Sequence, residues 1–381
     1  GIEKKSWHVT SDLDSGIGAF QGSRPAPPEY KMPAGDAWPL HRGIVHTFPA
    51  SGDADKNPYV FDVCCNKAGQ LAVSACGPGH AIKVYDRATL GCCAVLAGHA
   101  ARVNAIRFSQ LDSNSLFSAS SDSTLRLWDL RSPSPSHSFS AGGKEIWAAD
   151  MNADGTQLVA GCGHLLRVWD LRTRKVLRNY GDVHTDDITQ VRCHPTLASA
   201  VVSGGEDGLV CLVNNAAQDI DDALEAVLNC GVSLSRLGFA GQQHQQLYAL
   251  TSVHGVQMWD IGTEKLLVGI EDLRPALQTA ASHFPVPFEV SYLVDCKYSA
   301  TSDQLTLFAG GAEGHLGCWL MTPQGPACVA EMFDPNAHSE VVRGVDWDSD
   351  AGVLYTGGED CKLCAWSTGG QSGVPVQGLG A

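Results

Sequence analysis

The chain has 381 residues, a net charge of −15, a hydrophobic content of 44% and 41 glycines. This acidic balance disfavours a surface that binds nucleic acid or an anionic membrane, whereas a basic protein partner is electrostatically easier. No apolar run approaches the roughly 18 residues of a membrane-spanning helix. We therefore expect a globular, turn-rich protein whose partners are proteins, with no nucleic acid, no membrane and no small-molecule substrate.

Fourteen cysteines are spread through the sequence, and their placement argues against a disulfide framework. Most lie within strand-like apolar runs, and no secretory leader or glycosylation sequon accompanies them. We interpret the thiols as small buried side chains in a reducing compartment, the cytosol or the nucleus. Cys361 and Cys364 have half the spacing of a zinc knuckle. On a strand their sulfurs would point to opposite faces, so no metal site is predicted.

In chain order, the sequence divides into an extended N-terminal arm at 1–42, a repeat domain at 43–367 and a C-terminal tail at 368–381. The arm lacks periodicity and is rich in Gly, Pro and acidic residues. It also carries aromatic side chains, so two interpretations stay open: a mobile tail, or a segment that lies along a partner or the repeat domain. The segment Gly43–Phe48 is predicted to form one isolated strand.

The repeats begin at Tyr59, and the third strand of each ends at a large aromatic or apolar residue. Seven such endings occur, at Tyr85-Asp86, Trp128-Asp129, Trp169-Asp170, Val213-Asn214, Trp259-Asp260, Trp319-Leu320 and Trp366-Ser367. Seven endings predict an all-β fold of seven four-stranded units. No convincing outer strand follows Trp366, and Gly43–Phe48 is predicted to fill that place. Such closure removes the open sheet edges of the ring.

Four polar residues stand at suggestive offsets in the second unit: His99, Ser118, Asp122 and Trp128. An indole N–H can only donate a hydrogen bond and a carboxylate can only accept one, whereas a hydroxyl and an imidazole can each donate and accept. A hydrogen-bonded chain from Trp through Ser and His to Asp therefore satisfies every member. The set recurs in two further units, as His184, Ser203 and Asp207 with Val213 in place of Trp, and as His338, Thr356, Asp360 and Trp366. The other four units are predicted to be held by packing alone.

The Gly98-His99 pair followed by Trp128-Asp129 is the signature of a WD40 propeller blade. The repeats resemble WD40 proteins over residues 43–367, which implies a seven-bladed β-propeller closed by an N-terminal outer strand. Three stretches resemble the WD repeat-containing protein 89 family more closely: HTDDITQVRCHPTLASAVVSGGEDGLV, DIDDALEAV and HSEVVRGVDWDSDAGVLYTGGEDCKLCAW. That resemblance implies a protein that is not an enzyme.

No catalytic motif survives inspection, since the sequence has no nucleophile elbow, no H-E-x-x-H pair and no Walker loop. His99, Ser118 and Asp122 superficially suggest a hydrolytic triad. Their order and the Trp128 terminus explain them as a structural network instead. We therefore predict no catalytic residues and no cofactor.

The sequence gives better evidence for partner binding than for catalysis. This evidence lies at the start of each inner strand, where side chains are expected to project towards the top of a central channel. An insertion at about Asp272–Pro287 lies between two units and is expected on the same face, and the acidic segment Asp219–Glu225 is a second elaboration, within the fourth unit. Aromatic residues and arginines with acidic neighbours are typical of a peptide-binding surface. The predicted top-face residues are Tyr59, Phe61, Arg102, Asn104, Glu145, Trp147, Asp187, Glu206, Tyr292, Arg343 and Glu359. The alternative is a ring of ordinary solvated loop ends.

Two consecutive units end in WD-x-R, at Trp128–Arg131 and Trp169–Arg172. This pair resembles the motif by which some propellers dock on the adaptor of cullin-4 ubiquitin ligases. Arg131 and Arg172 would then donate bidentate hydrogen bonds from the bottom face. In the plainer interpretation each arginine pairs with an aspartate of its own unit. A non-catalytic scaffold is thus the first hypothesis, and a ligase substrate receptor is the second.

Overall fold

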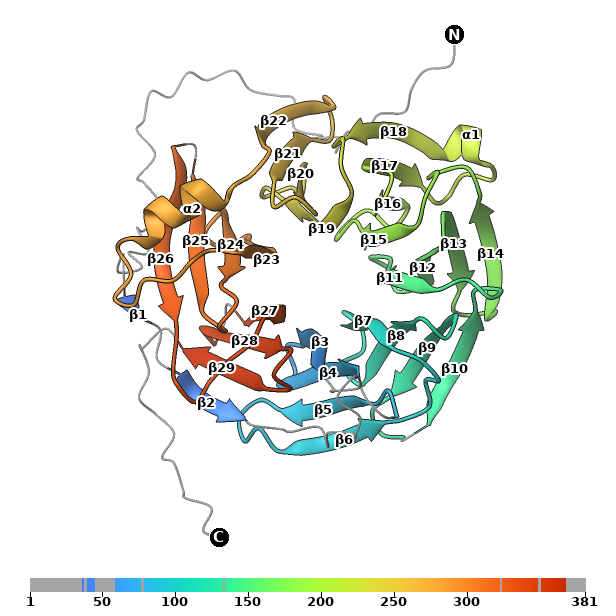
Figure 1. Ribbon diagram of the computed structural model, residues 1–381. Coiled ribbons are helices and arrows are strands. Elements are labelled where there is room, and N and C mark those ends of the chain that lie inside the picture. The colour runs from blue at the N-terminus through green and yellow to red at the C-terminus, as the bar shows by residue number, and fades with distance from the viewer. Residues whose placement is uncertain are drawn as a thin grey trace, which may run out of the picture.

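The computed structural model describes residues 36–37, 40–44, 59–76, 79–132, 134–322, 324–348 and 351–367. Within these residues the strands form seven sheets, or blades, each with four antiparallel strands, arranged around a central axis (Figure 1). The predicted seven-bladed all-β propeller is confirmed. The third strands of six blades end at the predicted dipeptides, and that of blade six runs two residues further, to Thr322.

The first four blades follow one another along the chain, each built from an inner strand, two middle strands and an outer strand. Blade one contains β3 (Tyr59–Cys65), β4 (Gln70–Cys76), β5 (Ile82–Asp86) and β6 (Cys92–Leu96). Blade two contains β7 (Val103–Phe108), β8 (Ser115–Ser120), β9 (Thr124–Asp129) and β10 (Pro135–Ser140). Blade three contains β11 (Ile146–Met151), β12 (Gln157–Cys162), β13 (Leu165–Asp170) and β14 (Lys175–Tyr180). Blade four contains β15 (Ile188–Cys193), β16 (Ala200–Gly205), β17 (Leu209–Asn214) and β18 (Leu224–Asn229), with the short helix α1 (Ile220–Ala223) before its outer strand.

The last three blades complete the ring. Blade five contains β19 (Leu234–Ala240), β20 (Gln246–Thr251), β21 (Val256–Asp260) and β22 (Lys265–Ile270). Blade six contains β23 (Tyr292–Ser299), β24 (Gln304–Gly310), β25 (Leu316–Thr322) and β26 (Gly325–Met332). Blade seven takes β27 (Val342–Asp348), β28 (Val353–Gly358) and β29 (Leu363–Ser367) from the end of the chain.

An N-terminal strand supplies the fourth strand of blade seven. β2 (Leu40–Ile44) pairs antiparallel with β29, with Gly43 opposite Cys364 and Ile44 opposite Leu363. The predicted closure by an N-terminal outer strand is confirmed, although the strand begins at Leu40 instead of Gly43. Residues 45–48 of the predicted strand lie outside the described residues. A second contact was not predicted: β1 (Asp36–Ala37) pairs parallel with the outer strand β26 of blade six.

The hydrophobic core consists of layers between neighbouring blades. The middle strand β16 is buried at every position, whereas the outer strand β22 is mostly exposed, as expected for sheets covered on both faces only near the axis. One core cluster joins blade seven to blade one through Tyr355, Leu363 and Val60. Comparable clusters join the other neighbouring pairs of blades. The ring is therefore closed by side-chain packing as well as by β2.

Each inner strand carries one extra residue near its start, relative to the strand that it pairs with. In blades one and two the extra residues are Phe61 and Asn104, and in blades four and seven they are Thr189 and Arg343. Blades three, five and six show the same register shift in β11, β19 and β23. A β-bulge bends its strand and re-aims its side chain. The bulges thus turn the first residues of the inner strands towards the mouth of the channel.

The predicted insertion forms helix α2 (Arg274–Ala281) and a following loop, which lie against blade six. Pro275 stands in the first helical turn, where its missing N–H costs nothing. Leu277 and Phe284 are buried, and the Phe284 ring meets the Trp319 ring edge-on, with 5.6 Å between centroids. The insertion therefore covers blade six with apolar side chains.

His194 makes the stability of the fold depend on pH. It follows β15, is 3% exposed, and its Nδ1 accepts the backbone N–H groups of Thr196 and Leu197 at 3.2 and 3.1 Å. Burial, with His244 nearby, lowers its pKa from 6.5 to about 4. Because the unfolded chain then takes up this proton first, the contribution is present above pH 6.5 and is lost as the pH falls towards 4.

We expect His194→Asn to flatten the fall in unfolding free energy between pH 6.5 and 4, because the Asn oxygen can still accept both N–H groups. Urea unfolding at several pH values measures this change. His164→Asn alters an exposed histidine and should leave the profile of the parent chain unchanged. If both variants lose unfolding free energy with falling pH as steeply as the parent chain, His194 is not the titrating group.

Candidate functional site

The polar set of blade two forms a continuous hydrogen-bonded chain. Trp128 Nε1 donates to Ser118 Oγ at 2.8 Å, Ser118 Oγ lies 2.7 Å from His99 Nε2, and His99 Nδ1 lies 2.7 Å from Asp122 Oδ2. Asp122 also accepts the backbone N–H groups of Ala100 and Thr124. The carboxylate therefore ties the connection from blade one to the turn between β8 and β9.

The same arrangement recurs in blades four and seven. His184 lies 3.0 Å from Asp207 and 2.9 Å from Ser203, while Val213 supplies no indole donor. In blade seven, His338 lies 3.0 Å from Asp360 and 2.8 Å from Thr356, whose hydroxyl accepts the Trp366 indole N–H at 2.8 Å. The structure therefore brings together each set of residues that the sequence spacing singled out.

Burial decides the protonation of the first two histidines. It lowers the pKa of His99 and His184 despite the carboxylate beside each, so both imidazoles are neutral at pH 7. Burial would raise the pKa of Asp122, but hydrogen bonds from Thr124, Ala100 and His99 lower it to about 2. Ser118 is fully buried beneath Trp128. The geometry suits a structural clamp, because no substrate can reach the hydroxyl.

Blades five and six lack the polar set of His, hydroxyl and Asp, and their tryptophans are accommodated in different ways. In blade six Ala309 stands where a hydroxyl would accept the Trp319 indole, and Trp319 Nε1 has no hydrogen-bond partner in the described part of the chain. The insertion packs over this ring instead. In blade five the Trp259 indole donates to Gln257 within its own strand at 3.1 Å.

The top face is the side that carries the turns between the middle strands and the connections between blades. The predicted top-face residues of blades one to three gather there around Arg102. Its guanidinium carbon lies 5.0 Å from the centre of the Phe61 ring and 4.8 Å from that of the Trp147 ring. Tyr59 extends the aromatic group, with its ring centre 6.2 Å from that of Phe61. All four side chains are partly exposed, so they form an accessible surface at the channel mouth.

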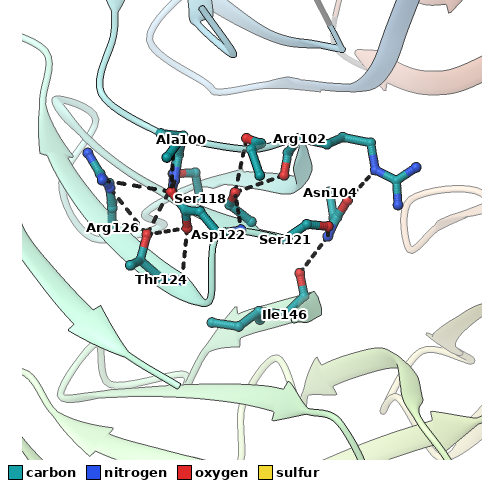
Figure 2. A network of polar contacts seen from close by, with 12 residues as sticks. Ala100, Arg102, Asn104, Ser118, Ser121, Asp122, Thr124, Arg126 and Ile146 are labelled. Carbon is teal, nitrogen blue, oxygen red and sulfur yellow. Dashed lines mark hydrogen bonds and ion pairs between the residues drawn. The ribbon is translucent and has the colours of Figure 1, made fainter. Parts of the chain in front are cut away.

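A second layer of hydrogen bonds holds Arg102 in place (Figure 2). Arg102 Nε donates to Asn104 Oδ1 at 2.8 Å, and Asn104 Nδ2 donates to Ser121 Oγ and to the Ile146 carbonyl. Ser121 Oγ in turn donates to Glu145 Oε2 at 2.9 Å. Asn104 is buried and links blade two to blade three. The cluster is thus rigid before any partner binds.

The remaining predicted top-face residues do not join this cluster. Arg343 Nε donates to Glu359 at 2.7 Å within blade seven, with half of the Arg343 side chain exposed. Tyr292 uses its hydroxyl to accept the Val342 N–H at 2.7 Å. Asp187 and Glu206 are both exposed on blade four. The predicted ring therefore separates into one aromatic–arginine cluster and smaller polar groups.

The two WD-x-R arginines differ. Arg131 donates from Nε and Nη2 to both oxygens of Asp129, at 2.8 and 2.7 Å, and its side chain is 71% exposed. Asp170, the matching aspartate of blade three, instead accepts from Thr173, and Arg172 is exposed. Arg131 therefore follows the plainer interpretation of this motif, whereas Arg172 does not.

Charged side chains in the central channel were missed by sequence reasoning. A cavity of about 570 Å³ is lined by Arg107, Arg192, Arg236, Lys297 and other residues of the inner strands. Three inner-strand aspartates bridge neighbouring blades: Asp62 accepts the Ile106 N–H, Asp150 the Cys193 N–H and Asp346 the Cys65 N–H. The sequence did carry a signal for these charged side chains. Each stands one or three positions after the bulge residue of its inner strand, and residues two apart on a strand lie on the same face.

Within the described residues, no group of three His, Cys, Asp or Glu side chains could hold a metal ion, and thirteen cysteines are free thiols. Cys364 lies on β29, but Cys361 lies in the preceding turn with φ of 63°. The prediction that both lie on one strand was wrong. Among these residues, no helix is long and apolar enough to cross a membrane.

Known proteins with similar sequences cover most of the chain. Residues 90–129, 133–170 and 328–367 match the family described as WD domain, G-beta repeat. A WD repeat-containing protein 89 homolog from Dictyostelium discoideum is 33% identical over 86% of this chain and 87% of its own length. WD repeat-containing protein GTS1 from Arabidopsis thaliana is 31% identical over 81% of each chain. Coatomer subunit beta'-1 from the same plant is 31% identical over 28% of this chain and 12% of its own.

Proposed function

The chain belongs to the WD40 β-propeller family of WD repeat-containing protein 89, and from that premise we propose that it is a non-catalytic scaffold that binds a peptide or protein segment on its top face. The cluster of Phe61, Arg102 and Trp147 supports this proposal most directly. Aromatic and arginine side chains dominate the binding energy of protein interfaces. Their hydrogen-bonded support keeps them in place, so a partner loses little binding energy to ordering them.

The charge of the chain favours a partner with basic side chains, because a net charge of −15 attracts cations over long range. Thirteen free thiols support a reducing compartment, the cytosol or the nucleus, as the place of action. We propose no catalytic residue and no cofactor, since the hydroxyls and imidazoles of the polar sets are buried and mutually bonded.

A substrate receptor of a cullin-4 ligase is the second proposal, and exposed Arg172 on blade three supports it. Adaptor docking would require Arg131 as well. Arg131 already makes two charge-assisted bonds to Asp129, which would have to break on docking. The scaffold therefore remains the better-supported function.

We expect Phe61→Ala with Trp147→Ala to reduce capture of specific partners at least about tenfold, because hot-spot truncations each cost about 2 kcal/mol. Affinity purification with quantitative mass spectrometry measures this loss. Leu267→Ala, on the exposed outer strand β22, is the matched control and should leave the partners unchanged.

Two further outcomes discriminate the proposals. An unchanged partner set in the Phe61 and Trp147 variant would reject binding at the aromatic–arginine cluster. The ligase proposal requires the cullin-4 adaptor in the purified material and its loss on Arg131→Ala with Arg172→Ala. Absence of the adaptor, or its retention in that variant, would reject the ligase role.

A further inference from the structure

The channel lining carries the opposite charge to the chain as a whole. Its acidic side chains are Asp62, Asp295 and Asp346, and its basic side chains are Lys67, Arg107, Arg192, Arg236 and Lys297. Positive charge therefore exceeds negative charge in the lining, although the protein carries a net charge of −15. Low-dielectric walls focus such a local excess onto whatever occupies the cavity.

Three of the five basic side chains make no ion pair among the described residues: the exposed Lys67 and the partly buried Arg192 and Arg236. Arg107 pairs with Asp62 at 2.8 Å, and Lys297 lies 3.3 Å from both Asp295 and Asp346. Among the described residues, Arg192 and Arg236 make no ion pair. Arg192 donates one bond to the Val191 carbonyl, and Arg236 donates to the carbonyls of Ser235 and Arg343. Most of the five N–H groups on each guanidinium are therefore available.

The nearby carboxylates are already engaged. Asp150 accepts the N–H groups of Met151 and Cys193, and Asp295 accepts the Cys296 N–H and pairs with Lys297. Burial and the charge of Arg107 lower the pKa of Arg192, while Asp150 and Asp295 act in the opposite direction without forming an ion pair with it. A partly buried cation that makes no ion pair keeps much of its desolvation cost, and an anion between the arginines would offset that cost.

The two arginines stand on adjacent blades in a way that suits one shared ligand. Arg192 lies on β15 and Arg236 on β19, and Gln190 Nε2 donates to the Ser235 carbonyl at 2.9 Å between these strands. Planar guanidinium groups match the oxygens of phosphate with paired N–H donors. The volume of about 570 Å³ is within the range of small-molecule sites.

We propose that the central channel binds a phosphate group. Arg192 and Arg236 hold it by hydrogen bonds, and the charges of Arg107 and Lys297 add to the positive potential at the site. The bound group belongs to a small phosphorylated molecule or to a phosphorylated side chain that enters the channel, and both present the same oxygens. Phe61 and Trp147 also line this cavity, but neither carries a charge, so substitutions of Arg192 and Arg236 test phosphate binding independently of partner binding by the aromatic–arginine cluster.

Isothermal titration with inorganic pyrophosphate at constant ionic strength tests the site. We expect saturable binding that weakens about tenfold on Arg192→Gln or Arg236→Gln and about a hundredfold on both, since each variant loses the charge-assisted hydrogen bonds of one guanidinium. Pyrophosphate should raise the melting temperature of the parent chain and leave that of the double variant unchanged. Without pyrophosphate, the double variant should melt no lower than the parent, because it has lost two unpaired cations.

Arg131→Gln with Arg172→Gln is the control, because it removes the same charge outside the channel lining. Equal affinity in all variants, or no saturable binding to the parent chain, would overturn the proposal. If the double glutamine variant fails to fold, Arg192→Lys and Arg236→Lys keep the charge, and unchanged affinity in both would overturn it as well. Competition by a phosphoserine peptide, but not by its serine form, would assign a side chain as the source, whereas failure of both to compete would assign a small molecule.

Discussion

Replacing Asp360 with alanine should lower the free energy of unfolding by about 2–4 kcal/mol, because the carboxylate serves several donors at once. Asp360 lies 3.0 Å from His338 Nδ1 and accepts the N–H groups of Ser339 and Lys362 at 2.8 and 3.1 Å. Alanine would leave all three donors without this acceptor. Chemical denaturation monitored by tryptophan fluorescence measures the loss, since Trp366 ends the same hydrogen-bonded chain.

Blade six offers a matched control for this experiment. Glu313 occupies the position of Asp360 relative to the third-strand tryptophan, but it is exposed and Ala309 stands in place of Thr356. Glu313→Ala should change the unfolding free energy by less than about 0.5 kcal/mol. Equal effects of the two substitutions would mean that the turn acidic residue acts through surface charge and not through the buried network.

The sequence predicted the polar sets because their members must satisfy one another. A buried Trp–Ser–His–Asp chain has few workable spacings, so the offsets of His99, Ser118, Asp122 and Trp128 carry geometric information. Gly98 adds to it: with φ of 149°, a Cβ there would lie 2.5 Å from Arg126 Nη1, so glycine is required before the histidine. Local rules of this kind are readable from one sequence.

Features that depend on the assembled ring were harder to predict. The stacking of Arg102 between Phe61 and Trp147 joins three blades, and the sequence spacing predicted only that each side chain faces the mouth. The pairing state of Arg192 and Arg236 depends on which side chains face them across the channel. The start of β2 at Leu40 also escaped prediction, because register with β29 is set by blade seven and not by the alternation of residues 43–48.

The central claim is that seven blades form a ring whose last blade is completed by β2. Leu363 and Trp366 of β29 are buried in the clusters on either side of blade seven, so this strand is part of the core. Without β2 the backbone of β29 becomes an open edge. Loss of its ladder hydrogen bonds and covered surface should cost about 5 kcal/mol, a large part of the stability of a typical domain.

Equilibrium denaturation of two shortened chains tests this claim most directly. A variant that begins at Leu40 loses β1 but keeps β2, and a variant that begins at Val45 loses both. We predict that the first unfolds close to the denaturant midpoint of the full chain, whereas the second unfolds at a far lower midpoint or aggregates. Equal midpoints for the two shortened chains would contradict closure by β2.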